Sequence, residues 1–171
     1  MKRRLFSLAL ALLLAGCVGK PDNITPVGQF DTAKYLGKWY EIARMDHSFE
    51  KGLSKVSAEY SLRDDGGLKV VNRGYNAAKA TWKEAVGKAY FVGPSDQGYL
   101  KVSFFGPFYG SYIVFELDRD YQYSLVSGPD KSYFWLLSRT PAMDTATLQG
   151  LVAKAKALGF DTSKLIYVAQ N

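Results

Sequence analysis

The stretch VSAEYSLRDDGGLKVVN, residues 56–72, decides the fold class. Apolar and polar side chains alternate along residues 56–62, which is the pattern of a strand with one buried face. The segment Asp64-Asp65-Gly66-Gly67 then predicts a tight turn, because glycine accepts a positive φ at little cost. Leu68, Val70 and Asn72 continue the buried face on the returning strand. The stretch therefore predicts an antiparallel β-hairpin.

The chain on both sides of this hairpin repeats the same kind of pattern. Short segments rich in Tyr, Phe and Val, separated by turn residues, run from Trp39 to Leu137. No internal repeat is present, and the expected mature chain, residues 17–171, has the length of one domain. Beyond the hairpin, strands are expected at residues 84–92, 99–105, 109–117, 122–127 and 133–138.

A single strong helix is expected late in the chain. Apolar residues recur at helical spacing over residues 148–158, with Asp144 or Thr145 as the N-cap and Gly159 as the stop. A short strand at residues 164–169 follows. Eight strands in sequence and then a helix indicate an all-β fold: an eight-stranded antiparallel up-and-down barrel with the C-terminal helix packed outside. A barrel of this size encloses room for one small ligand.

The beginning of the chain has the pattern of a bacterial lipoprotein signal. A basic head at residues 2–4 precedes an apolar run over residues 5–14 that is too short to span a bilayer. Small residues then lead into Cys17. We expect residues 1–16 to be cleaved as a signal peptide and Cys17 to be lipidated on its thiol and acylated on its new amino end. The alternative is an ordinary signal peptide in which the cysteine is incidental.

Cys17 is the only cysteine of the 171 residues, so no disulfide holds the fold. Residues 17–29 contain two prolines and two glycines and predict a flexible lipidated tether, with the barrel domain over residues 30–171. Several acyl chains on one residue give stable membrane anchoring. Because Val18 follows the cysteine in place of the aspartate that commonly retains lipoproteins at the inner membrane, we expect a lipid-anchored location at the outer membrane, facing the periplasm.

Charge and motifs exclude several function classes. Without the basic head of the signal the chain has 19 basic and 16 acidic residues, too mild a balance to indicate a nucleic-acid partner. The chain has no Gly-x-Ser-x-Gly motif and a single histidine, which leaves little scope for a hydrolytic triad or a transition-metal site. No glycine loop of the phosphate-binding kind precedes a helix. We therefore expect no catalytic residues, no metal and no cofactor.

Three segments resemble the signatures of the lipocalin family, in the expected order. Gly37-Lys38-Trp39-Tyr40-Glu41-Ile42-Ala43 resembles the first, Asp118-Arg119-Asp120-Tyr121-Gln122-Tyr123 the second, and Leu136-Leu137-Ser138-Arg139-Thr140-Pro141 the third. The second departs from the usual Thr-Asp-Tyr start, and the disulfide that often pins the family's carboxyl end is lacking. The resemblance covers the whole mature domain. It implies that Gly37, Trp39 and Arg139 are structural, with Trp39 and Arg139 stacked at the closed end of the barrel.

The same resemblance, combined with strand parity, implies which side chains line a ligand site. Small residues leave volume there and aromatic residues form an apolar wall suited to an acyl chain. The alternative is a solid core without a cavity. The expected lining residues are Val56, Ala58, Tyr60, Val70, Asn72, Ala89, Phe91, Leu100, Val102, Phe104, Tyr133 and Trp135.

Two segments near the expected mouth remain open to interpretation. Residues 44–52 predict a long loop, in which a cation could meet a phosphate or carboxylate headgroup, or the charges could simply be solvated. His47 is expected to be a surface residue. Residues 104–110, FFGPFYG, predict an aromatic hairpin whose outward members could touch lipid or another subunit.

Taken with the resemblance, these patterns favour a membrane-anchored lipid-binding protein. The ligands implied are a fatty acid or a lysophospholipid, for storage, transport or repair of lipid in the bacterial envelope. Two alternatives are a lipid-modifying enzyme on the same scaffold and a structural envelope lipoprotein. The sequence does not predict an oligomeric state.

Overall fold

A computed structural model describes residues 18–171, so the predicted signal peptide and Cys17 lie outside the described residues. Helical segments are α1 (Thr32–Tyr35), η1 (Ala77–Lys79), α2 (Thr145–Ala157) and η2 (Thr162–Lys164). The strands are β1 (Gly37–Arg44), β2 (Leu53–Leu62), β3 (Leu68–Asn76), β4 (Thr81–Phe91), β5 (Tyr99–Phe105), β6 (Phe108–Leu117), β7 (Tyr123–Ser127), β8 (Phe134–Ser138) and β9 (Ile166–Tyr167). Within these residues no helix has both the length and the apolar character that crossing a membrane requires.

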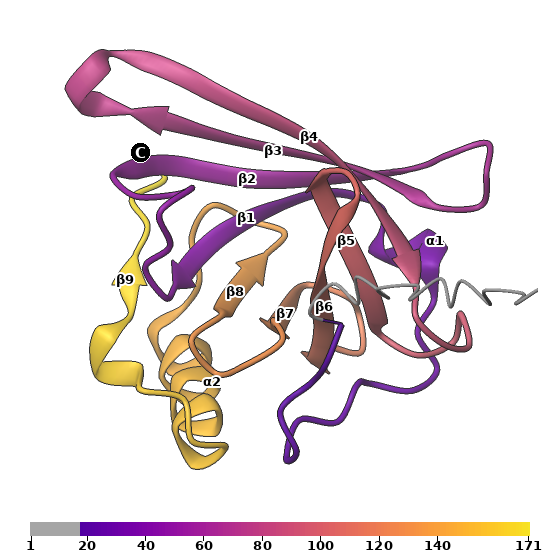
Figure 1. Cartoon of the computed structure of the whole chain (residues 1–171). Helices are drawn as coiled ribbons and strands as arrows, with labels where there is room; N and C mark the ends of the chain where they lie inside the picture. The colour runs from indigo at the N-terminus through magenta and orange to yellow at the C-terminus, as the bar shows by residue number, and fades with distance from the viewer. Residues whose placement is uncertain (1–17) are drawn as a thin grey trace, which may run out of the picture.

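Strands β1 to β8 form the predicted antiparallel up-and-down barrel (Figure 1). Each strand pairs with the next along the chain, and β1 closes the barrel by pairing with both β2 and β8. The opening hairpin is confirmed: Leu62 pairs with Leu68, and Gly66 takes a φ of 81° in the turn. The fold class and the order of the strands are therefore confirmed.

The ninth strand fills a place that β2 leaves empty. β1 pairs with β2 only over Gly37–Tyr40, and beyond that point β9 lies beside β1 at Ala43 and Arg44. The Gln170 side chain then donates to the backbone carbonyls of both Glu41 and Val56, at 2.7 and 2.8 Å. The carboxyl end of the chain thus joins β1 to β2 where their own ladder ends.

Helix α2 packs outside the barrel, as predicted (Figure 1). Asp144 is the N-cap and accepts a hydrogen bond from the backbone N–H of Thr147. Leu151 and Ala155 are buried against an outer core that includes Phe134 and Phe160. Apolar area between helix and barrel wall stabilises this arrangement by roughly 25 cal/mol per Å² removed from water.

The segment before the barrel differs from the predicted flexible tether. Ile24 is fully buried in the outer core. The Val27 N–H donates to the Val114 carbonyl, and the Val27 carbonyl accepts from the Gly98 N–H. The Phe30 N–H donates to the Asp96 carbonyl. Residues 18–29 therefore lie along the barrel wall, because scattered apolar residues and free backbone groups find partners there despite the two prolines.

A short helix and one arginine close one end of the barrel. The opposite end, where the loop from β1 to β2 lies, is called the mouth. Asp31 caps α1, a helix of four residues that no periodic pattern could predict. The Arg139 guanidinium lies 3.9 Å from the centre of the Trp39 ring and donates to the carbonyls of Lys34, Lys38 and Tyr121, at 2.6, 2.9 and 3.2 Å. The stacked pair expected from the family resemblance is present.

Truncating either member of this pair should lower stability without selectively removing ligand binding. Trp39→Ala should lower the free energy of unfolding by about 3–5 kcal/mol, as for other buried aromatic residues. Arg139→Ala leaves three carbonyls without their charged donor and should lower it by about 1.5–3 kcal/mol. Urea unfolding and fatty-acid binding are measured on the same proteins.

Arg119→Ala is the matched control, because Arg119 is exposed near the same end of the barrel. Its free energy of unfolding should stay within about 0.5 kcal/mol of the parent. A variant of Trp39 or Arg139 that kept full stability yet lost its ligand would contradict the structural role.

Candidate functional site

The barrel interior holds the residues predicted to line a ligand site. Ladder pairs such as Tyr60 with Val70, and Ala89 with Val102, place both members on the inner face. An apolar cluster inside the barrel contains nine of the twelve predicted residues: Ala58, Tyr60, Val70, Ala89, Phe91, Leu100, Val102, Phe104 and Trp135.

The other three predicted residues lie outside that cluster. Val56 is buried, and its side chain borders Gly74, where an added Cβ would lie 3.2 Å from Val56 Cγ2. Asn72 is half-buried opposite Ala58, and Tyr133 stacks on a loop histidine. The structure therefore brings all twelve residues to the interior or its rim; whether they contact a ligand stays a prediction.

A network of tyrosine hydroxyls occupies the closed half of the interior. Tyr112 Oη lies 2.7 Å from Tyr35 Oη and accepts a hydrogen bond from Tyr60 at 2.8 Å. Burial raises the pKa of Tyr35 to about 12 and holds the pKa of Tyr60 and Tyr112 well above 10.0. These hydroxyls are therefore neutral and satisfy one another, so they set the polar floor of an otherwise apolar interior.

A buried charged cluster lies at the mouth, and sequence reasoning missed it. Arg44 is 1% exposed; its Nη1 donates to Glu41 Oε1 at 2.7 Å and its Nη2 to the Glu50 carbonyl at 2.9 Å. The Glu50 carboxylate accepts from Trp135 Nε1 at 3.1 Å. Arg44 belongs to β1 and is buried against these partners, so both interpretations of the predicted loop, a cation free to meet a headgroup and a solvated charge, are wrong for Arg44.

Burial perturbs the two carboxyl groups of this cluster. It raises the pKa of Glu41 well above 4.5, and the nearby Glu50 carboxylate raises it further, against the opposing effect of Arg44. Burial also raises the pKa of Glu50. With two carboxyls and one guanidinium out of water, holding one proton neutralises the cluster.

The single histidine is buried over this cluster, so the prediction of a surface residue is wrong. The His47 ring stacks between Phe49 and Tyr133, with centroid distances of 5.2 and 4.5 Å, and Trp135 lies 5.2 Å away. Burial, and then the charge of Arg44, lower the pKa of His47 below 6.5. The stack joins the loop after β1 to β8 and covers one side of the mouth.

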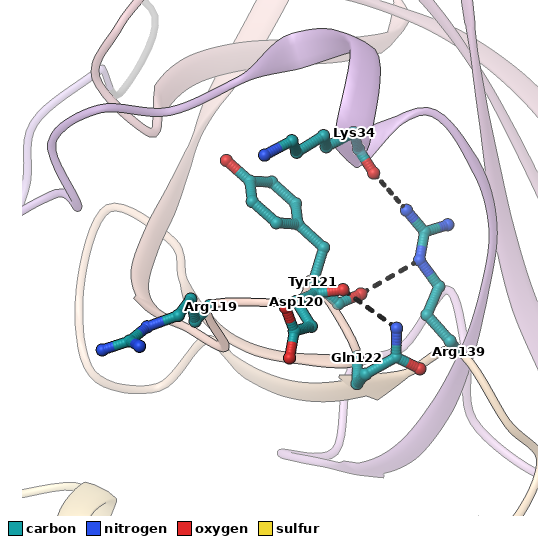
Figure 2. Close-up of a pocket in the computed structure, with 6 residues that line it drawn as sticks. All are labelled: Lys34, Arg119, Asp120, Tyr121, Gln122 and Arg139. Carbon is teal, nitrogen blue, oxygen red and sulfur yellow. Dashed lines mark hydrogen bonds between the residues drawn. The ribbon is translucent and has the colours of Figure 1, made fainter.

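The hollow drawn in Figure 2 is distinct from the barrel interior. It lies at the closed end and has a volume of about 330 Å³. Arg139 donates to Lys34 and Tyr121 there, and Gln122 Nε2 donates to the Asp120 carbonyl (Figure 2). The Arg139 and Gln122 side chains bond backbone carbonyls there, so we assign the hollow the structural role of the closed end. Within residues 18–171 no three His, Cys, Asp or Glu side chains gather as metal ligands.

Residues 30–170 match the model of the lipocalin-like domain. The chain belongs to the lipocalin family. It is 59% identical to the outer membrane lipoprotein Blc of Vibrio cholerae serotype O1, over 99% of each chain. Identity to the outer membrane lipoprotein Blc of Escherichia coli K12 is 54%, over 94% of this chain and 92% of that protein.

Solved structures agree on the fold. Insecticyanin from the tobacco hornworm Manduca sexta superposes with a TM-score of 0.68 at 23% identity, over 87% of this chain and 85% of that chain. Lipocalins are in general binding proteins for small hydrophobic molecules.

The buried carboxyls should make stability depend on pH. Because folded Glu41 binds its proton more tightly than the unfolded chain does, the free energy of unfolding should fall as pH rises above 4.5 towards the raised pKa. Glu41→Gln keeps an oxygen acceptor for Arg44 but does not titrate, so its decline should be shallower. Urea unfolding at a series of pH values from 4.5 upward measures this. Glu59→Gln, exposed on β2, is the control, and equal slopes in both variants would refute the assignment.

Proposed function

We propose that this lipocalin is a lipid carrier that buries the acyl chain of one fatty acid or lysophospholipid in its barrel. The observation that carries the proposal is the polarity of the interior. Apolar side chains from most strands form the wall, while the charged side chains gather at the mouth. An amphipathic lipid has the same division along its length.

The wall suits an acyl chain in particular. Each methylene moved from water into an apolar interior contributes about 0.8 kcal/mol, so a long chain supplies most of the affinity. Ala58 and Ala89 present small side chains to the inner face, among larger residues such as Leu100 and Phe104. The tyrosine hydroxyls at the closed end are hydrogen-bonded to one another, so they need no hydrogen-bond partner from the apolar tail of the lipid.

The headgroup is assigned to the mouth, next to Glu41, Arg44 and Glu50. These groups are hydrogen-bonded to one another and to Trp135, so a headgroup there meets a nearly neutral polar cluster rather than a free cation. Binding is then reversible, because nothing covalent is formed and the headgroup stays near water.

The location follows the relatives: the protein is a lipid-anchored protein of the outer membrane, as the proteins 51–59% identical to it are named. We assign the anchor to Cys17, which ends the signal pattern and has no other cysteine to pair with. Storage, transport or repair of envelope lipid are the roles that fit such a protein.

Lipid binding by a delipidated preparation tests the proposal directly. Saturable binding of a long-chain fatty acid or a lysophospholipid without turnover supports a carrier. Formation of a product would favour a lipid-modifying enzyme, and neither binding nor turnover would favour a structural envelope lipoprotein.

Filling the interior should weaken binding. Ala58→Trp or Ala89→Trp places a large ring where the acyl chain is proposed to lie, so fatty-acid affinity should fall at least tenfold, about 1.4 kcal/mol. Ser61→Trp, exposed on β2, is the control and should keep its affinity. If the interior is a solid core, the two alanine variants should instead lose about 1–3 kcal/mol of stability, with no binding in the parent.

Removing the proposed lipidation site should release the protein from membranes. Cys17→Ser lacks the thiol that carries the lipid, so the several acyl chains that give stable anchoring are not attached. Membrane fractionation with mass spectrometry of the amino end measures the effect. A variant still processed and held in the outer-membrane fraction would contradict the lipoprotein assignment.

A further inference from the structure

The hairpin between β5 and β6 presents two phenylalanines to solvent. Phe105 is 82% exposed and Phe108 is 66% exposed, and the two residues are direct partners across the hairpin. Neither belongs to the apolar clusters inside or outside the barrel. Two neighbouring aromatic rings without a partner at a hairpin tip indicate an interaction surface.

The outer wall beside this hairpin is basic. Lys69, Lys88 and Lys101 lie on the outward positions of β3, β4 and β5, and Lys69 is the direct cross-strand partner of Lys88. Within residues 18–171 none of the three forms an ion pair, and directly opposed like charges destabilise a sheet. The ammonium groups of Lys88 and Lys101 lie 5.9 and 5.1 Å from the ring centre of Tyr109. This arrangement suits an external anionic surface.

The amino end of the described chain lies on the same wall (Figure 1). The Tyr99 hydroxyl donates to the carbonyl of Val18, and Ser111 Oγ donates to the carbonyl of Gly19 at 2.5 Å. Ser111 is the cross-strand partner of Lys101. Ser111 follows the hairpin tip by only a short run of β6, about 10 Å from Phe108 at the rise of a β-strand. Any lipid on Cys17, the residue before Val18, is therefore attached beside the lysines and the phenylalanines.

We propose that Phe105, Phe108, Lys88, Lys101 and Tyr109 form a membrane-docking face for an anionic phospholipid surface. The phenylalanines enter the interfacial region, where aromatic rings are favoured, and the lysines meet lipid phosphates. The proposal rests on the proposed anchor at Cys17, because that anchor fixes which wall of the barrel faces the bilayer.

A lipid surface fits these observations better than a second copy of the chain. Two copies meeting through this face would oppose lysine to lysine, whereas phosphate headgroups complement them. Docking also has a consequence for the carrier. The β5–β6 hairpin lies at the same end of the barrel as the charged mouth, so docking holds the mouth against the membrane, and a lipid can leave the bilayer with little exposure to water.

Spin labels on the lipidated protein in vesicles test the proposal. Phe105→Cys and Phe108→Cys are labelled with a nitroxide in vesicles of phosphatidylethanolamine and phosphatidylglycerol. Leu62→Cys is the matched control, since Leu62 is also 66% exposed but lies at the β2–β3 turn, at the closed end. Because Cys17 is the only native cysteine, the parent takes up label only if its thiol is free, which reports failure of the anchor separately.

Labels at positions 105 and 108 should collide more with oxygen, which concentrates in the bilayer, than with a water-soluble nickel chelate. The label at position 62 should show the opposite preference. Labels at 105 and 108 that match the control would overturn docking, and labels shielded from both reagents would overturn it in favour of a protein partner.

Reversing one charge tests the lysines. Lys101→Glu should reduce the oxygen preference of the label at position 108 several-fold, whereas Lys156→Glu, exposed on α2, should leave it unchanged. Replacing phosphatidylglycerol by phosphatidylcholine should reduce it in the parent as well. Equal behaviour of the two variants would overturn the role of the lysines.

Discussion

The Arg139 guanidinium is the interaction on which the rest of the barrel depends. Its donors reach carbonyls of α1, of β1 and of the turn before β7, three parts of the chain that share no ladder at that point. Its flat face covers the Trp39 ring, whose own N–H donates to the Tyr35 carbonyl. A lysine could supply the charge but not this planar set of donors. This closes the end of the barrel at which β1, β3, β5 and β7 begin.

The mouth follows a different physical logic. Glu41, Arg44 and Glu50 are charged groups taken out of water, and such a cluster adds little net stability even when its members are paired. Removing one partner, however, leaves another charge buried alone. The cluster therefore fixes one arrangement of the loop after β1, and the aromatic stack around His47 fastens that loop to β8. The cluster and the stack therefore fix the position of the loop after β1 and add little to the stability of the barrel.

Much of the fold and of the inner wall could be predicted from the sequence, because strict alternation specifies which strand residues face inward. Ala58, Val70 and Ala89 follow from strand parity combined with the family resemblance. The polar parts could not be predicted in this way. Arg44 and Glu50 lie six residues apart in a segment whose charges a hydropathy pattern assigns to solvent. Their burial depends on Trp135, which comes from a strand distant in the sequence. Tyr35 lies on a helix too short to produce a periodic signal.

The segment before the barrel shows the same limit from another side. Its prolines and glycines are typical of a linker, yet Ile24, Val27 and Phe30 find apolar and backbone partners along the wall. Composition indicates the conformation of an isolated segment, whereas contacts with a neighbouring sheet determine its conformation in the folded protein. Because the segment is bound, an anchor at Cys17 cannot let the barrel swing freely. The wall that is hydrogen-bonded to residues 18 and 19 must then stay near the membrane. The direction in which the mouth points is therefore set by the folded structure and not by a flexible linker.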